Sequence, residues 1–123
     1  TLVLAGDGGF MLNLGELACA AQERAPLVVL LMNDQRYGVI RNIQDDIYGS
    51  RHCYVDLHTP DFAMLCASMG VAHQRVSDPA QAHAAVGAAL SRAADGPVVV
   101  EIDMAAWGPF AVKFAGPPKK VEA

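Results

Sequence analysis

At 123 residues, with 53% apolar and 18% charged side chains, the chain is long enough and apolar enough to fold around one hydrophobic core rather than to be disordered. Its formal net charge of −4 gives no basic surface for nucleic acid, and its longest apolar run, residues 27–32, is too short to span a bilayer, so neither partner is expected. The three cysteines show no C-x-x-C spacing, which favours a reducing cytoplasm over a disulfide framework or a zinc site.

The first half of the chain predicts two strands separated by a helix. Residues 1–5 form a short apolar run that ends in glycines, which is typical of a buried strand. Apolar residues then recur at i, i+3, i+4 and i+7 and predict a helix over about residues 13–24. Residues 27–32 are continuously apolar, as in a strand covered on both faces of a parallel sheet. Residues 37–58 follow no such pattern, so we expect a long loop with one or two helical turns near residues 39–44.

The second half of the chain predicts two further pairs of a helix and a strand. A helix is expected over residues 62–69, with Thr59 as its cap, and a strand over residues 71–76. A second helix begins near the Asp-Pro-Ala-Gln segment and covers residues 78–95, and residues 97–102 form the last strand. This alternation predicts an α/β fold with a mainly parallel sheet flanked by helices.

The two ends of the chain bear on its domain organisation. The first residue is Thr1 rather than an initiator methionine, and the first predicted strand begins at once. We therefore expect the chain to be the C-terminal piece of a longer protein. Within it, residues 1–104 are expected to form part of one α/β domain, and residues 105–123 a C-terminal tail.

Two polar clusters follow the first and second predicted strands. Gly6-Asp7-Gly8-Gly9-Phe10 ends the first strand, and Asn33-Asp34 ends the second. Parallel neighbouring strands deliver their carboxyl ends to the same edge of a sheet, so the two clusters should lie together. Glycines allow backbone amides to approach an anion closely, but Asp7 would repel a phosphate unless a hard cation sits between them. The pattern thus predicts a site for a divalent cation and a phosphate.

Other interpretations of the glycine cluster remain at this point. An ordinary strand-to-helix turn followed by an ordinary loop would carry the same residues. A dinucleotide site is disfavoured, because Met11 stands where the third glycine of G-x-G-x-x-G belongs. The chain also has no G-K-[ST] segment, so a nucleoside-triphosphate P-loop is unsupported.

The two clusters with their spacing resemble the thiamine-diphosphate motif. Gly-Asp-Gly is followed after 24 residues (9–32) by Asn33-Asp34, where that motif carries a paired asparagine. The segments Phe-Met-Leu-Asn-Leu-Gly-Glu-Leu-Ala (10–18) and Leu-Leu-Met-Asn-Asp-Gln (30–35) are similar to the acetolactate synthase and 2-oxo-acid decarboxylase branch of this superfamily. The resemblance covers nearly the whole chain. It implies that residues 1–104 are the C-terminal part of a diphosphate-binding domain.

The resemblance also implies roles for individual residues. Asp7 and Asp34 are expected to bind magnesium through their side chains, and Arg36 through its backbone carbonyl. Asp34 departs from the family pattern, which usually has asparagine there; a carboxylate adds negative charge beside the diphosphate but should bind magnesium more strongly. The residues expected at the cofactor are Gly6, Asp7, Gly8, Gly9, Phe10, Asp34, Tyr37, Gly38 and Val39, and those expected in the substrate pocket are Ile40 and Ile43.

The function implied by the resemblance is that of a thiamine-diphosphate- and Mg²⁺-dependent enzyme acting on a small-molecule 2-oxo acid. It would decarboxylate that acid or transfer its acyl unit, as acetolactate synthase does, in a homodimer or homotetramer. A lyase similar to benzoylformate or pyruvate decarboxylase and a non-catalytic phosphate- or nucleotide-binding module are the alternatives. In this family the activating glutamate belongs to a separate domain of the neighbouring subunit. Nothing here matches it, Glu16 included, so no catalytic residue is expected and the piece alone should be inactive.

Overall fold

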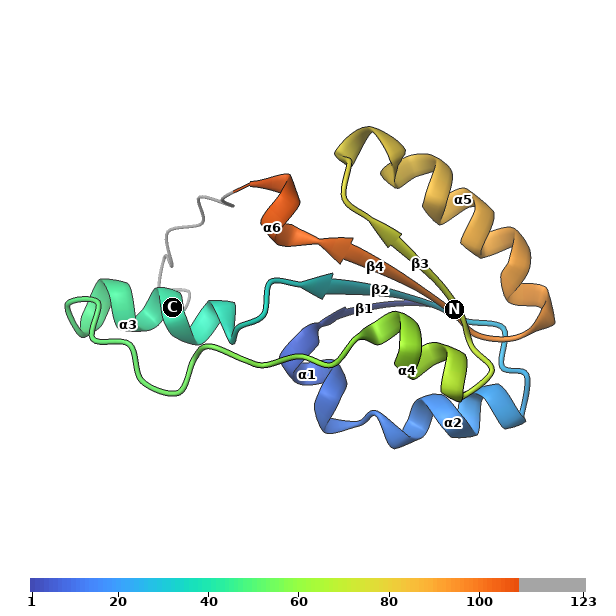
Figure 1. Ribbon diagram of the computed structural model, residues 1–123, viewed down its shortest axis with the longest axis horizontal. Helices are drawn as coiled ribbons and strands as arrows, with labels where there is room; N and C mark the ends of the chain where they lie inside the picture. The colour runs from blue at the N-terminus through green and yellow to red at the C-terminus, as the bar shows by residue number, and fades with distance from the viewer. Residues whose placement is uncertain (109–123) are drawn as a thin grey trace, which may run out of the picture.

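The structure, a computed structural model, describes residues 1–108 and contains a four-stranded parallel sheet between two layers of helices (Figure 1). Helix α5 covers one face of the sheet, and α1, α2 and α4 cover the other. The strands are β1 Leu2–Gly6, β2 Val28–Asn33, β3 Ala72–Val76 and β4 Val98–Asp103. The helices are α1 Asp7–Leu12, α2 Gly15–Gln22, α3 Gly38–Ile47, α4 Phe62–Ser68, α5 Ala82–Arg92 and α6 Met104–Trp107, with short 3-10 turns η1 Pro79–Gln81 and η2 Ala93–Asp95. The predicted α/β fold with a parallel sheet is confirmed.

The order of the strands, β1-β2-β4-β3, decides which loops meet. Each neighbouring pair is parallel, and the registers place Gly6 beside Met32 and Asn33 beside Asp103. The carboxyl ends of β1, β2 and β4 therefore lie next to one another, with the start of α1 following β1 without a gap. This edge of the sheet carries both polar clusters that the sequence singles out.

Alternating side chains of the central strands fill two separate cores. On one face, Val28 and Val100 pack against Ala85 and Ala89 of α5, whose small side chains let that helix lie close to the sheet. On the other face, residues of β2 and β4 pack against α2 and α4; this core comprises Leu17, Val29, Leu31, Phe62, Cys66, Val71 and Val99. Both faces of β2 are covered by helices, which explains why its sequence is continuously apolar, as predicted.

The helix expected over residues 13–24 is confirmed as α2, but three other details differ from the prediction. A further helix that was not predicted, α1, precedes α2 and starts within the glycine cluster at Asp7. The cap of α4 is not Thr59 but Asp61, whose Oδ1 accepts a hydrogen bond from the amide of Met64 at 2.9 Å. The helical turns expected near residues 39–44 of the loop 37–58 are present, but they form a longer element, the ten-residue helix α3. That helix buries none of its residues and extends away from the sheet (Figure 1), although its apolar residues repeat at helical spacing.

The strand β1 lies at the edge of the sheet and exposes apolar side chains. Leu2 is 54% exposed and Leu4 is 72% exposed. At the other end of the described chain, α6 occupies the residues around the expected domain boundary at 104–105. The rest of the expected tail lies outside the described residues. None of the helices within residues 1–108 has the length and apolar character needed to cross a membrane.

Candidate functional site

A pocket of about 290 Å³ opens at the carboxyl edge of the sheet. It is lined by residues from the start of α1, the loop after β2, the first turn of α3 and the start of α6: Gly6, Asp7, Gly8, Gly9, Met32, Asp34, Arg36, Tyr37, Gly38, Val39, Ile40 and Met104. Ten of these residues are the ones that the sequence proposes for a metal, a cofactor or a substrate. The fold thus brings together residues separated by some 30 positions in the chain.

Asp7 is the buried charge of this pocket. Its residue is only 1% exposed, because the first turn of α1 folds directly over the end of β1. One carboxylate oxygen, Oδ1, accepts a hydrogen bond from the amide of Gly8 at 2.8 Å, whereas Oδ2 is buried without a hydrogen-bond partner. Burial raises the pKa of Asp7, the neighbouring Asp34 raises it further, and the amides of Gly8 and Gln35 act against both effects. An unpaired buried carboxylate oxygen is costly unless a cation or a proton meets it.

The second carboxylate, Asp34, lies in a sharply turned loop. Gln35 has a φ of +55°, in the left-handed region that side chains other than glycine seldom adopt. The Arg36 guanidinium folds back over the turn: its Nε donates to the carbonyl of Asp34 at 3.0 Å and lies 3.8 Å from the carboxylate. A strained backbone of this kind persists only where surrounding structure enforces it.

The structure that enforces this turn comes from residues 55–57. The amide of Tyr37 donates to the carbonyl of Val55 at 2.8 Å, and the amide of Leu57 donates to the carbonyl of Gln35 at 2.8 Å. Arg36 and Asp56 form an isolated antiparallel bridge between these two bonds. We call this pairing of residues 35–37 with residues 55–57 the clamp. Val55 is 2% exposed, so the clamp is anchored in the interior. The loop that carries Asp34 and Arg36 is therefore held in place before any ligand binds.

At two positions in the pocket, a neighbouring side chain lies so close to the backbone that only glycine fits. A Cβ at Gly8 would overlap the ring of Tyr37, with 2.7 Å to its Cδ1. A Cβ at Gly38 would lie 2.8 Å from Oδ2 of Asp34. Any larger residue at Gly38 would therefore push on the carboxylate that is a candidate metal ligand. By contrast, the space around Gly6 and Gly9 is open, as a site for a bulky anion requires.

Two of the residues proposed from the sequence lie outside this pocket. Phe10 packs in the core, with its ring 5.9 Å from that of Phe62 in an edge-on arrangement at 65°. Ile43 is half-buried one turn further along α3 and does not line the pocket. Their contacts with a cofactor or a substrate stay predictions. Conversely, Met32 and Met104 line the pocket although neither was predicted from the sequence to do so. Met104 reaches the pocket because β4 lies beside β2 in the sheet, and this strand order cannot be read from the sequence.

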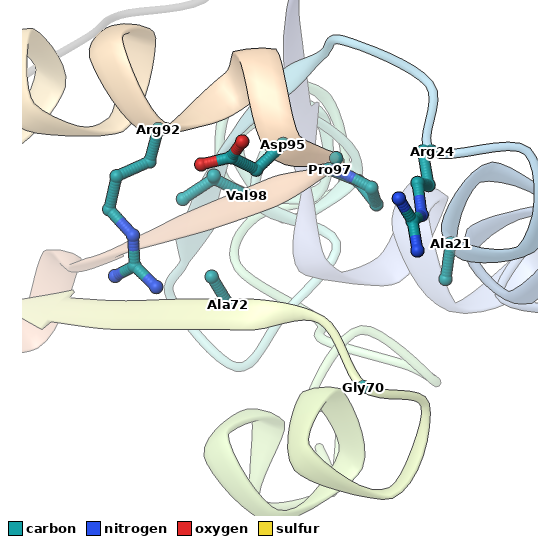
Figure 2. Close-up of a pocket in the computed structure, with 9 residues that line it drawn as sticks. Ala21, Arg24, Gly70, Ala72, Arg92, Asp95, Pro97 and Val98 are labelled. Atoms are coloured by element: carbon teal, nitrogen blue, oxygen red, sulfur yellow. The ribbon is translucent and has the colours of Figure 1, made fainter.

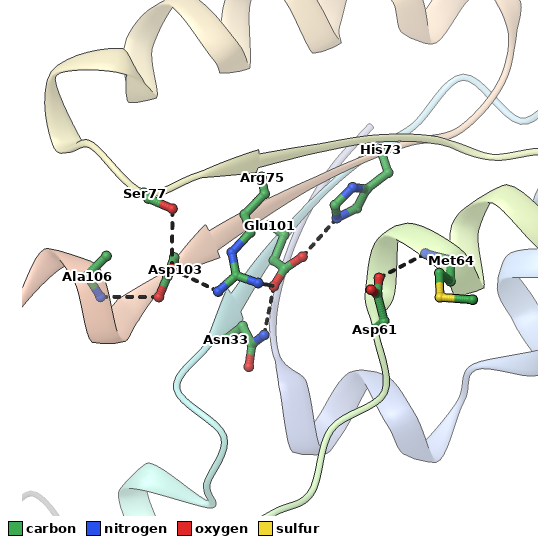
Figure 3. Close-up of polar contacts among 9 residues, drawn as sticks. All are labelled: Asn33, Asp61, Met64, His73, Arg75, Ser77, Glu101, Asp103 and Ala106. Carbon is green, nitrogen blue, oxygen red and sulfur yellow. Dashed lines mark hydrogen bonds and ion pairs between the residues drawn. The ribbon is translucent and has the colours of Figure 1, made fainter.

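Asn33 has a different role from the one its place in the motif suggests. It does not line the pocket, and it is only 7% exposed. Its Nδ2 donates to Oε1 of Glu101 at 2.7 Å, on the neighbouring strand (Figure 3). Of the Asn33-Asp34 pair, only Asp34 faces the pocket.

The donor set of the pocket is that of a hard cation. Its side-chain donors are carboxylate oxygens, and the Arg36 carbonyl is close by in the chain. Among residues 1–108, no group of three or more His, Cys, Asp or Glu side chains is arranged as a complete metal site. A magnesium ion here would therefore take further oxygens from the backbone, water and a phosphate ligand, which is how this ion is usually held. Both the unpaired oxygen of Asp7 and the open space beside the glycines fit such a group.

A second cavity, also of about 290 Å³, lies at the opposite edge of the sheet and shares none of these residues (Figure 2). The side chains of Arg24, Arg92 and Asp95 face it. Charges of both signs line this cavity, and none of the residues proposed from the sequence contributes to it. The carboxyl edge, where α/β sheets usually bind ligands, is the candidate site.

The fold and the pocket together define a class: an α/β domain with a glycine-bordered pocket that holds two carboxylates at the carboxyl edge of its parallel sheet. Residues 1–102 match the family described as "Thiamine pyrophosphate enzyme, C-terminal TPP binding domain". The chain belongs to this family.

Its relatives include acetolactate synthases. The chain is 31% identical over 102 residues to the "Acetolactate synthase isozyme 2 large subunit" of Escherichia coli strain K12, a match that covers 82% of this chain and 18% of that protein. It is 32% identical over 91 residues to a "Probable acetolactate synthase large subunit" of Methanococcus aeolicus, covering 73% of this chain and 15% of the relative.

A solved structure shares the fold: the Rhodococcus jostii RHA1 "thiamine diphosphate-dependent 4-hydroxybenzoylformate decarboxylase" has a TM-score of 0.68 and 26% identity, over 81% of this chain and 19% of that one. The chain thus spans less than a fifth of the length of the proteins it matches.

Proposed function

We propose that this chain supplies the anchor for the diphosphate of thiamine diphosphate, bound through Mg²⁺, in an enzyme that acts on a 2-oxo acid. The observation that carries the proposal is the buried Oδ2 of Asp7, which has no hydrogen-bond partner and belongs to a pocket that also holds the Asp34 carboxylate. Burial makes the ionised form of Asp7 costly and the charge of Asp34 adds to that cost, so both raise the pKa of Asp7. A divalent ion removes that cost.

The residues that would hold the metal are Asp7 and Asp34 through carboxylate oxygens and Arg36 through its carbonyl. The backbone at Gly8 and Gly9, at the start of α1, would face the diphosphate: the space beside Gly9 is open, and Gly8 has no side chain that would push the Tyr37 ring aside. When bound, thiamine diphosphate supplies the electron sink for decarboxylation of the 2-oxo acid. The chain's own contribution is to bind and orient, through a loop that is already clamped.

The substrate class and reaction follow from the relatives and from the apolar side of the pocket. Val39, Ile40, Met32 and Met104 give this side an apolar wall, which suits the carbon chain of a small 2-oxo acid. The names of the relatives support an acetolactate-synthase-like transfer of an acyl unit, and the structural match supports a lyase that only decarboxylates. We propose the synthase-like reaction first, since the two relatives named above are acetolactate synthases. We further propose that this chain by itself is inactive, because residues 1–108 offer no candidate for the group that activates the cofactor.

Two measurements on the full-length protein test the proposal. Calorimetric titration with thiamine diphosphate should show tight binding with Mg²⁺ present and much weaker binding when the metal is chelated. Product analysis over a panel of 2-oxo acids, with and without a second 2-oxo acid as acceptor, separates the synthase from the decarboxylase. Binding of nucleotides with no Mg²⁺-dependent binding of thiamine diphosphate would contradict the proposal and favour a phosphate-binding module.

Assembly into a homodimer or homotetramer is also proposed. It is supported by the apolar side chains that the described chain leaves exposed, Leu4 and Leu12 at 72% and 76% among them. Large apolar side chains that a chain leaves exposed are common at protein contacts. Sedimentation of the full-length protein should show two or four subunits, and a monomer at micromolar concentration would contradict this part of the proposal.

A further inference from the structure

Glu101 is a buried carboxylate in the middle of the most covered strand. It lies on β4 between Val100 and Ile102, is 2% exposed, and is paired in register with Leu31 of β2. Neither a place in the pocket nor packing in the apolar core explains why a charged residue lies here. A buried charge persists only where hydrogen bonds and opposite charges offset its desolvation.

Glu101 has three polar partners, which lie on both sides of β4 (Figure 3). Its Oε1 accepts a hydrogen bond from Nδ2 of Asn33 at 2.7 Å and lies 3.6 Å from Nη1 of Arg75. Its Oε2 is hydrogen-bonded to Nε2 of His73 at 2.9 Å. His73 and Arg75 belong to β3, on the outer side of the sheet, whereas Asn33 is the last residue of β2.

The contact with Asn33 leads directly to the candidate metal site. Asn33 immediately precedes Asp34, the carboxylate in the pocket, and its own register partner on β4 is Asp103. The bond from Asn33 to Glu101 is therefore a diagonal one on the same face of two neighbouring strands, and it ties the end of β2 to the centre of β4. Asn33 Oδ1 is buried without a partner, so within the described residues the orientation of this amide is set by Glu101.

We propose that Glu101 is a positioning residue for the metal site: by holding the Asn33 amide, it fixes the end of β2 and the direction in which Asp34 enters the pocket. This inference rests on the proposed function. Outer partners of this kind hold ligands in productive geometry, and their removal typically lowers metal affinity about 10- to 100-fold. The two other partners of Glu101 stabilise its charge but do not touch the loop.

The test uses the full-length protein and four variants. Glu101→Leu removes the acceptor, Glu101→Gln keeps an oxygen that can accept from Asn33, and Asn33→Ala breaks the same bond from the other side while leaving Glu101 its partners on β3. His73→Leu is the matched control, because it removes a partner of the same carboxylate without touching Asn33. For each protein, the Mg²⁺ dependence of thiamine diphosphate binding is measured by calorimetry, and the melting temperature is measured without cofactor.

The expected result is a loss of Mg²⁺ affinity of about 10- to 100-fold in Glu101→Leu and in Asn33→Ala, with affinity close to wild type in Glu101→Gln and His73→Leu. The double variant Glu101→Leu/Asn33→Ala should lose no more than either single variant, because both act through one bond. If Glu101→Leu does not fold, Asn33→Ala against His73→Leu decides the question alone.

Two results would overturn the inference while leaving the proposed function intact. One is wild-type Mg²⁺ affinity in Asn33→Ala. The other is an equal loss of affinity in His73→Leu and Asn33→Ala that merely follows the loss of melting temperature, since the role would then be structural. A wild-type protein that binds no thiamine diphosphate overturns the proposed function and this inference together.

Discussion

Replacing Gly38 by alanine should weaken metal binding without weakening the fold. Gly38 is the first residue of α3, and its φ is not in the left-handed region, so alanine suits the backbone there. The added Cβ would lie 2.8 Å from Oδ2 of Asp34, where ordinary contact requires 3.4 Å or more. The carboxylate must therefore retreat by about 0.6 Å, the difference between those two distances. A magnesium site tolerates deviations of only about 0.2 Å in its ligand distances.

The expected magnitude is a loss of Mg²⁺ affinity of about tenfold, or roughly 1.4 kcal/mol. The assay is calorimetric titration of thiamine diphosphate over a series of Mg²⁺ concentrations, with the melting temperature of the cofactor-free protein as the measure of stability. Gly87→Ala, in the middle of α5 with open space around its Cβ position, is the matched control and should leave the Mg²⁺ affinity unchanged. Raising the Mg²⁺ concentration should restore binding in Gly38→Ala. Unchanged Mg²⁺ affinity in that variant would refute the assignment of Asp34 as a ligand.

Three further outcomes are expected. Asp34→Asn should still bind the metal but more weakly, because an amide oxygen replaces a carboxylate; tighter Mg²⁺ binding in a calorimetric titration would contradict this. The hydrogen bond from Arg75 holds the pKa of Asp103 below its ordinary value. The pair therefore stabilises the folded state at any pH above the unfolded-state pKa of about 3.8, and this stabilisation is lost as the pH falls through the lower pKa of the folded state. Asp103→Asn should therefore lower the melting temperature at neutral pH and flatten its decline in acid, and parallel pH profiles would contradict this. Burial raises the pKa of Cys66 to about 11, so iodoacetamide at pH 8 should label the two exposed cysteines first and Cys66 only on unfolding, as read by mass spectrometry.

The strands were predictable because a parallel sheet demands continuous apolar runs. The run at residues 27–32 matches β2 within one residue at each end, and the glycine cluster follows β1 directly, as predicted. The pocket residues near Asp7 and Asp34 were predictable for the same reason. Strand ends with polar residues meet at one edge wherever the strands are parallel neighbours.

What the sequence did not show depends on contacts between distant segments. Only one or two helical turns were predicted where α3 forms, although Val39, Ile40, Ile43 and Ile47 repeat at helical spacing, because this helix faces no core. The clamp by which residues 55–57 hold the loop around Arg36 consists of backbone hydrogen bonds. Any residue except proline can donate such bonds, so the residue types do not predict them.

Glu101 carried a signal that could have been used. It is a charge inside the apolar run Val-Val-Val-Glu-Ile, which is predicted to be buried on both faces, and such a charge requires partners. Identifying Asn33 as one of them required the order of β2 and β4 in the sheet.

The most direct test of the central claim concerns the unpaired oxygen of Asp7. Asp7→Asn keeps the size of the side chain and replaces a carboxylate oxygen by an amide, while Asp46→Asn makes the same change at an exposed position on α3. Both variants of the full-length protein are titrated with thiamine diphosphate in the presence of Mg²⁺. We expect Asp7→Asn to lose Mg²⁺-dependent binding and Asp46→Asn to bind as the wild type does. Full Mg²⁺-dependent affinity in Asp7→Asn would contradict the account.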